Sequence, residues 1–117
     1  MEKEETIDKA RELINALEEK KAENIVLIDI REIAIFTDFF VICSGTSNRL
    51  LRALVRAAEE TMNEKFRVKG RIIGEPANGW IAIDFTDIVL HIFSPQKRSY
   101  YQLEDLWSEG KTLLKVA

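Results

Sequence analysis

Two short stretches of the chain are apolar at almost every position, and they constrain the fold more than any other feature. Residues 25–30 and 39–43 are rich in β-branched and aromatic side chains and have the length of strands. No apolar run approaches the ~20 residues that a membrane span needs. A strand that is apolar on both sides requires cover on both faces, as in sheets with helices packed against them. We therefore expect an α/β protein.

Two segments have the apolar spacing of amphipathic helices. Residues 6–22 repeat apolar side chains at helical intervals, and Thr6 is a suitable N-cap. Residues 48–66 show the same spacing directly after Ser47, another good N-cap. The side chains that we expect the second helix to bury are Leu51, Leu54, Val55, Ala58 and Met62.

The second half of the chain alternates short apolar runs with turn residues, and 80–93 reads as an antiparallel hairpin. The expected elements are a strand over 69–74, a turn over 75–79, strands over 80–85 and 87–93, a helix over 99–108 ended by Gly110, and a tail over 111–117 without assigned structure. The predicted order αββαβββα is an α/β fold: a mixed sheet of about five strands flanked by helices. At this length, residues 1–117 are expected to form one domain.

Composition and charge exclude several classes of protein. Cys43 is the only cysteine, so no internal disulfide can form, which suits a reducing cytosol. His91 is the only histidine, so these two residues are too few to form a zinc cluster. Residues 1–5 do not resemble a signal or transit peptide, so we expect a cytoplasmic protein. The net charge is −3, but residues 48–71 carry seven basic and three acidic side chains. Either the basic side of the protein attracts an anionic partner, or two helix faces of opposite charge are simply solvated.

The turn Ser44-Gly45-Thr46-Ser47 joins the second apolar strand to a helix. Amides at a helix N-terminus favour anions, small residues allow close approach to the backbone, and Arg49 would add charge. The Gly-Lys-Ser/Thr of a Walker A loop is missing. The turn is similar to the Gly-Ser turn of nucleotidyltransferases, but no acidic residue follows before Glu59 to hold magnesium. We favour a strand end that caps a helix over a possible anion-binding turn.

The predicted hairpin carries polar groups in an apolar neighbourhood. Strand alternation places Asp87, His91 and Phe93 on one face, with Asp84 nearby, where they would form a patch for a partner. The alternative is a turn capped by aspartates and one satisfied histidine. Cys43 with His91 would be a nucleophile–base pair, but a cysteine at the end of an apolar strand is usually inert, and no third orienting group is evident. We therefore expect no thiol enzyme.

The segment after the hairpin is rich in residue types that dominate protein interfaces. On one helix, Tyr100, Leu103, Leu106 and Trp107 would share a face, and the two leucines are expected to point into the core. Arg98 and one tyrosine are expected to stay exposed beside the hairpin. Tyr, Trp and Arg are the types enriched at binding hot spots.

Three ordered blocks of sequence resemble the ribosomal silencing factor family, also called Iojap-like. The most recognisable is 38–49, Asp-Phe-Phe-Val-Ile-Cys-Ser-Gly-Thr-Ser-Asn-Arg. The resemblance extends from the first helix to Trp107. Thr86 stands where the family usually has glycine, and Leu50 where a polar residue is common. The other two blocks consist of Gly79, Trp80, Asp84, Asp87, His91, Ile92 and Phe93, and of Arg98, Tyr100, Tyr101, Leu103, Glu104, Leu106 and Trp107.

The resemblance implies a fold and a function. The fold would be related to nucleotidyltransferases, without their catalytic carboxylates, so the protein would be neither an enzyme nor a binder of a cofactor or metal. It would bind the large ribosomal subunit through the ribosomal protein conventionally numbered fourteen and hinder association with the small subunit. Translation would fall when nutrients are scarce. Some family members are dimers, so a homodimer is possible.

The resemblance also carries over a set of contact residues. A tryptophan and a tyrosine would supply buried area, and an aspartate would pair with basic side chains of the ribosomal protein. The expected binding residues are Trp80, Asp84, Asp87, His91, Arg98, Tyr100 and Tyr101. Two rival functions remain: a nucleotide-binding protein or degenerate nucleotidyltransferase that uses the Ser44–Ser47 turn, and a general RNA-binding module that uses the basic residues of 49–71.

Overall fold

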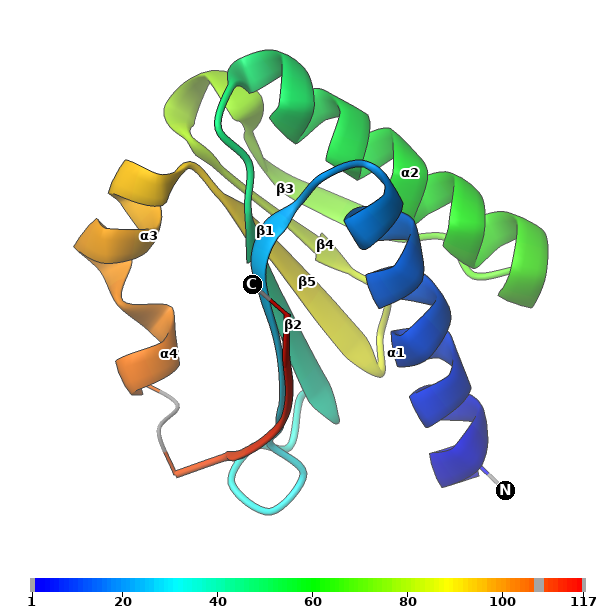
Figure 1. The fold of residues 1–117 in the computed structure, drawn as a ribbon. Coiled ribbons are helices and arrows are strands. Elements are labelled where there is room, and N and C mark those ends of the chain that lie inside the picture. The colour runs from blue at the N-terminus through cyan, green and yellow to red at the C-terminus, as the bar shows by residue number, and fades with distance from the viewer. Residues whose placement is uncertain (1, 107–108, 117) are drawn as a thin grey trace.

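A computed structural model describes the backbone of residues 2–106 and 109–116, and it is built around one mixed six-stranded sheet (Figure 1). The strand order is β3-β4-β5-β2-β1-β6. The elements are α1 (Glu2–Glu19), β1 (Glu23–Asp29), β2 (Phe39–Ser44), α2 (Asn48–Phe66), β3 (Arg71–Glu75), the 3-10 turn η1 (Pro76–Asn78), β4 (Trp80–Asp84), β5 (Ile88–Phe93), α3 (Pro95–Tyr101), α4 (Leu103–Leu106) and β6 (Lys111–Val116). No helix within these ranges is both long and apolar enough to cross a membrane.

The two most apolar strands lie at the centre of the sheet. β2 is buried at all six positions, and it pairs antiparallel with β1 and parallel with β5. The hairpin β4–β5 then carries the sheet outward to β3, and β6 pairs antiparallel with the outer side of β1. Central strands that are apolar on both sides therefore present two apolar faces, as their sequences predict.

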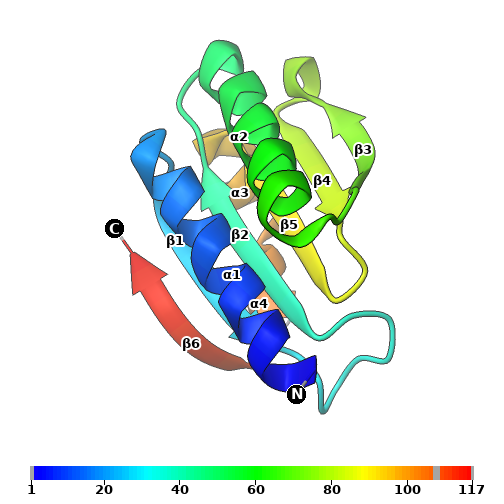
Figure 2. The same ribbon diagram turned by 90° about the vertical axis from the view of Figure 1, so that its right-hand side faces the viewer.

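One face, called here the helix face, carries the larger core. Helices α1 and α2 lie side by side across it (Figure 2). Their apolar stripes pack on the alternate side chains of the strands that point toward them. Examples are Leu13 and Leu17 of α1, Leu54 of α2, and Leu90 and Ile92 of β5.

The opposite face, called here the open face, has a smaller core and less cover. Its buried cluster is Val26, Ile28, Ile30, Phe40, Ile42 and Phe93. The short helices α3 and α4 lie on this side, opposite α1 and α2 (Figure 1). Seven-residue and four-residue helices cover less of a sheet than helices of 18 and 19 residues. Apolar strand residues therefore remain accessible on this face.

Most of the predicted elements are confirmed. The second helix covers Asn48–Phe66 as predicted, and the Ser47 hydroxyl accepts a hydrogen bond from the Leu50 amide at 3.0 Å. Both early strands and the antiparallel hairpin are also present. The predicted buried stripe holds except that Val55 is only partly buried.

The N-cap prediction for Thr6 is wrong. Helix α1 already begins at Glu2, so Thr6 lies inside it, and its hydroxyl donates to the Asp87 carboxylate at 3.0 Å. The threonine is buried because it points toward the sheet, and the distant aspartate satisfies its hydroxyl. The pattern that looked like a cap is a contact between α1 and the β4–β5 turn.

The C-terminal predictions need two corrections. The helix expected over 99–108 instead starts at Pro95 with Ser94 as its N-cap, and Gln102 in a left-handed conformation (φ 48°) breaks it. Tyr100 and Leu103 therefore do not share one continuous helix face. The tail expected without structure forms the sixth strand, β6. The side chain of Leu106 and the whole of Trp107 lie outside the described residues.

Candidate functional site

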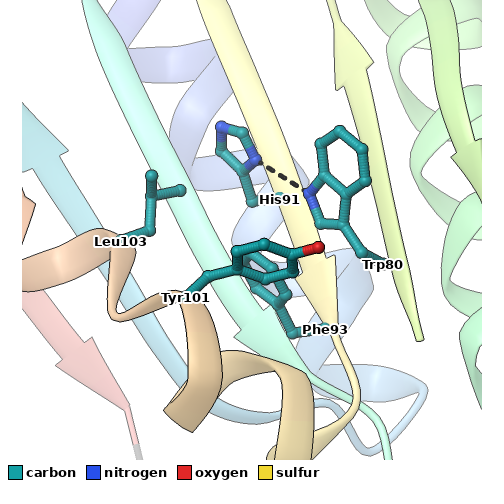
Figure 3. A pocket seen from close by; sticks show the side chains of 5 residues that line it. All are labelled: Trp80, His91, Phe93, Tyr101 and Leu103. Carbon is teal, nitrogen blue, oxygen red and sulfur yellow. Dashed lines mark hydrogen bonds between the residues drawn. The ribbon is translucent and has the colours of Figure 1, made fainter. Parts of the chain in front are cut away.

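The open face contains an apolar pocket between the hairpin and the helical segment (Figure 3). Its volume is about 220 Å³. For scale, a 150 Å³ apolar cavity holds benzene. Two strands and the break between α3 and α4 supply the lining, which consists of Trp80, His91, Phe93, Tyr101 and Leu103. The pocket can therefore receive one large apolar side chain.

Ring contacts fix the side chains on the floor of the pocket. The Trp80 indole N–H donates to Nδ1 of His91 at 3.4 Å, and the two rings lie nearly parallel (Figure 3). His91 also stacks on Phe93 at 6.1 Å between centroids, and Phe93 touches Tyr101 at 5.9 Å. The register of the hairpin explains the arrangement, because Trp80 pairs with Phe93, and His91 pairs with the small residue Ala82.

His91 behaves here as a neutral aromatic ring. Burial lowers its pKa from 6.5 to about 4, so the ring is uncharged at neutral pH. Because Nδ1 accepts the indole N–H, the proton is assigned to Nε2, which is buried without a hydrogen-bond partner among the described residues. Phe40 meets this ring edge to face at 4.9 Å. The alternative interpretation, a satisfied structural histidine, therefore holds for Nδ1 but not for Nε2.

Arg98 has a structural role that the sequence did not reveal. We expected it to stay exposed, but its side chain is only 12% exposed. Its Nε and Nη2 donate to both carboxylate oxygens of Glu104, at 3.1 and 2.8 Å. Its Nη1 donates to the Asn24 carbonyl at 2.6 Å and to the Ser44 hydroxyl at 3.1 Å. The guanidinium thus ties α3 and α4 to β1 and β2, and it lowers the pKa of the Glu104 carboxyl.

The two aspartates of the hairpin lie on different sides of the sheet. Asp84 caps the turn by accepting the Thr86 amide at 2.8 Å and lies 3.6 Å from Arg71. Asp87 instead contacts Lys9 of α1 at 3.3 Å. The prediction that Asp87 shares a face with His91 is therefore wrong. The strand begins only at Ile88, and the positive φ of Thr86 (82°) turns the backbone before it.

Further apolar side chains are exposed outside the pocket. Tyr100 is exposed and meets Tyr101 edge to face at 5.1 Å. Ile73 of β3 pairs with Ala82 and so belongs to the open face. Ile35 and Phe36, in the connection between β1 and β2, are also exposed. The last three were not among the predicted site residues, although adjacent apolar residues in a connection were a visible signal.

The Ser44–Ser47 turn is occupied by internal contacts. The Gly45 amide donates to the Phe93 carbonyl at 2.9 Å, and the two serine hydroxyls bind Arg98 and the Leu50 amide. A Cβ on Gly45 would lie 3.0 Å from Leu51, so close packing explains the glycine. Thr46 and Arg49 are exposed. The geometry matches a strand end that caps a helix.

The structure separates the side chains of Cys43 and His91. Cys43 is buried in the core of the helix face, and burial raises the pKa of its thiol to about 12. His91 pairs with Ile42, the residue before Cys43. Because successive side chains of a strand point to opposite faces, His91 lies on the other side of the sheet. Within the described residues, no three His, Cys, Asp or Glu side chains are grouped to hold a metal.

Comparisons with known proteins agree on one family. A family profile described as "Ribosomal silencing factor during starvation" matches residues 3–116. The chain is 34% identical over 100 residues to the "Ribosomal silencing factor RsfS" of Halalkalibacterium halodurans, covering 86% of each chain. It is also 34% identical over 100 residues to mouse "Mitochondrial assembly of ribosomal large subunit protein 1", covering 82% of this chain and 43% of that protein. A crystal structure of a Chromobacterium violaceum protein matches with a TM-score of 0.82 and 27% identity, over 86% of this chain and 84% of the other.

Proposed function

This chain belongs to the ribosomal silencing factor family, and from that premise we propose that it represses translation by occupying the large ribosomal subunit. The proposed contact is the ribosomal protein conventionally numbered fourteen, and the bound chain blocks docking of the small subunit. The observation that carries the proposal is the apolar pocket on the open face, with Trp80 and Tyr101 at its walls. The name of the mouse relative, which refers to the large subunit, supports the choice of subunit.

The chemistry of the pocket favours a protein partner. Its lining is aromatic and aliphatic, and His91 is neutral at physiological pH. Apolar pockets with aromatic walls are where interface anchors bind, whereas RNA phosphates require accessible cations. The guanidinium of Arg98 is already bound by Glu104, and the ammonium of Lys97 lies over the Tyr100 ring at 5.6 Å from its centroid. We therefore assign Trp80 and Tyr101 as anchors and Asp84 and Tyr100 as contacts at the rim.

The proposed mechanism is steric and requires no reaction. A standard interface buries ~1,600 Å² in total, which is enough to hold a small protein on a surface that the other subunit must approach. Occupancy then depends on the concentration of the chain relative to its dissociation constant. Silencing is reversible, because release of the chain frees the large subunit to join again.

A subunit-joining assay tests the proposal directly. Purified large and small subunits are mixed with increasing amounts of the protein and separated on a sucrose gradient. We expect the full-ribosome peak to fall while the protein migrates with the large subunit. An unchanged full-ribosome peak, with the protein at the top of the gradient, contradicts the proposal.

Two adjacent isoleucines provide a matched test of which face binds. Ile73 and Ile72 of β3 are similarly exposed, at 42% and 47%, but Ile73 pairs with Ala82 on the open face and Ile72 with Ile83 on the helix face. Ile73→Ser should weaken subunit binding, and Ile72→Ser should not. Trp80→Ala should weaken it by about 2 kcal/mol or more. Equal binding by both isoleucine variants would exclude the open face as the interface.

A further inference from the structure

The connection between β1 and β2 exposes large apolar side chains on an ordered loop. Ile35 is fully exposed, Phe36 is 57% exposed, and Ile33 is partly exposed. Hydrogen bonds close the loop at its base, from the Ile30 amide to the Asp38 carbonyl at 3.0 Å and from the Ala34 amide to the Ile30 carbonyl at 2.9 Å. Clusters of exposed apolar residues on ordered segments mark interaction sites more often than isolated ones do.

Ring contacts connect this loop to the pocket of the open face. The Phe36 ring lies 5.9 Å from Phe40, whose ring meets His91 at 4.9 Å. His91 in turn accepts the indole N–H of Trp80. The loop is the cyan segment at the lower end of the sheet in Figure 1. A row of aromatic rings therefore runs from the loop to the pocket along one side of the sheet.

The charges of the loop indicate which class of partner it fits. Its single cation, Arg31, is held by both carboxylate oxygens of Asp29, at 2.9 and 2.6 Å. Glu32 and Asp38 add negative charge beside the apolar side chains. RNA binding depends on cations that contact phosphates, and this loop offers none that is unpaired. Its apolar surface suits a protein.

We propose that the loop 33–36 is a second contact for the ribosomal protein that occupies the pocket, with Ile35 as its principal side chain. The inference rests on the proposed function. The bound protein then spans the open face from the pocket to the loop.

Ile35→Ser is the decisive variant, since a fully exposed side chain has no internal packing to lose. Affinity for purified large subunits and for the isolated ribosomal protein is measured for the wild type, Ile35→Ser, the control Ile72→Ser and Trp80→Ala. We expect Ile35→Ser to weaken both affinities about tenfold, as for loss of one buried aliphatic side chain, and Ile72→Ser to leave them unchanged. Phe36→Ser should act in the same direction.

The outcomes separate this inference from the proposed function. If Trp80→Ala weakens binding while Ile35→Ser binds like the wild type, the loop contact is overturned and the function stands. If the wild type does not bind the large subunit, both fail. If Ile35→Ser changes only the molecular mass in sedimentation velocity, the loop joins copies of this chain and the inference is overturned. Additive losses in the Ile35→Ser/Trp80→Ala double variant support two contacts with one partner.

Discussion

The two faces of the sheet are both apolar, but they are covered to very different extents. Among the described residues, the core of the helix face contains twenty buried side chains, those of α1 and α2 included, and that of the open face contains six. Apolar burial is the main source of folding free energy. The comparison indicates that the helix face contributes most of the folding free energy and that the open face leaves apolar surface accessible, where we propose that a partner binds.

The largest expected effect is on the helix face. Leu54 is completely buried between α2 and the sheet, so Leu54→Ala leaves a cavity and should lower the free energy of unfolding by about 2–5 kcal/mol. Urea unfolding measures the loss. The folded fraction should still bind large subunits normally. If Leu54→Ala lowers the free energy of unfolding less than Trp80→Ala does, the helix face is not the main source of stability.

The acid sensitivity of the fold should come largely from the open face. The pKa of His91 is lowered from 6.5 to about 4 in the folded state, so the unfolded chain binds a proton more readily. Stability is therefore complete above pH 6.5 and falls as the pH drops from 6.5 to about 4, by roughly 3 kcal/mol. Urea unfolding measured at several pH values between 6.5 and about 4 tests this fall in stability. Since His91 is the only histidine, His91→Phe should abolish most of the slope.

Loss of Arg98 should loosen the open face while the helix face stays closed. Arg98→Met removes hydrogen bonds to Glu104, Asn24 and Ser44 and should lower the free energy of unfolding by about 2 kcal/mol. Amide exchange should accelerate first in α3 and α4. Uniform acceleration across α1 and α2 would show that the two faces unfold together. Arg98→Lys keeps the charge and serves as the control.

The smallest expected effects distinguish the two N-caps. Ser47 caps α2 and Ser94 caps α3, each by accepting an amide three residues later. Ser47→Ala should lower the free energy of unfolding by about 1 kcal/mol, because α2 belongs to the main core. Ser94→Ala should affect global stability less and subunit binding more. The opposite ranking would mean that α3 is essential to the fold.

Elements with a strong local pattern were predictable from the sequence. The second helix has a complete apolar stripe and a serine cap, and β1 and β2 are continuous apolar runs, so local preference and burial agree. β6 was missed because an edge strand with exposed, partly charged residues lacks an apolar alternation. Its pairing with β1 depends on a neighbour that is distant in sequence.

Site residues were predictable only where pairing within one hairpin determines their position. Trp80 and His91 lie together as expected because hairpin pairing is local. The predicted positions of Asp87 and Arg98 were wrong. The side chain of Asp87 is held by Lys9 of α1, and that of Arg98 is held by Glu104, which lies beyond a helix break. Ile35 was not among the predicted site residues although it stands next to Phe36 in the connection, because a loop has no periodicity from which the exposure of a side chain can be predicted.

The parallel pairing of β2 with β5 joins strands that are far apart in the sequence. β1 and β2 are separated only by residues 30–38, whereas residues 45–87 must be arranged before β5 reaches β2. Pairings of high sequence separation close long loops and are slow to form. Phe40 comes from the early pair, and Trp80 and His91 come from the late hairpin. Since the pocket is lined by residues of β4, β5, α3 and α4, a chain in which only β1 and β2 have paired has no pocket to offer a partner.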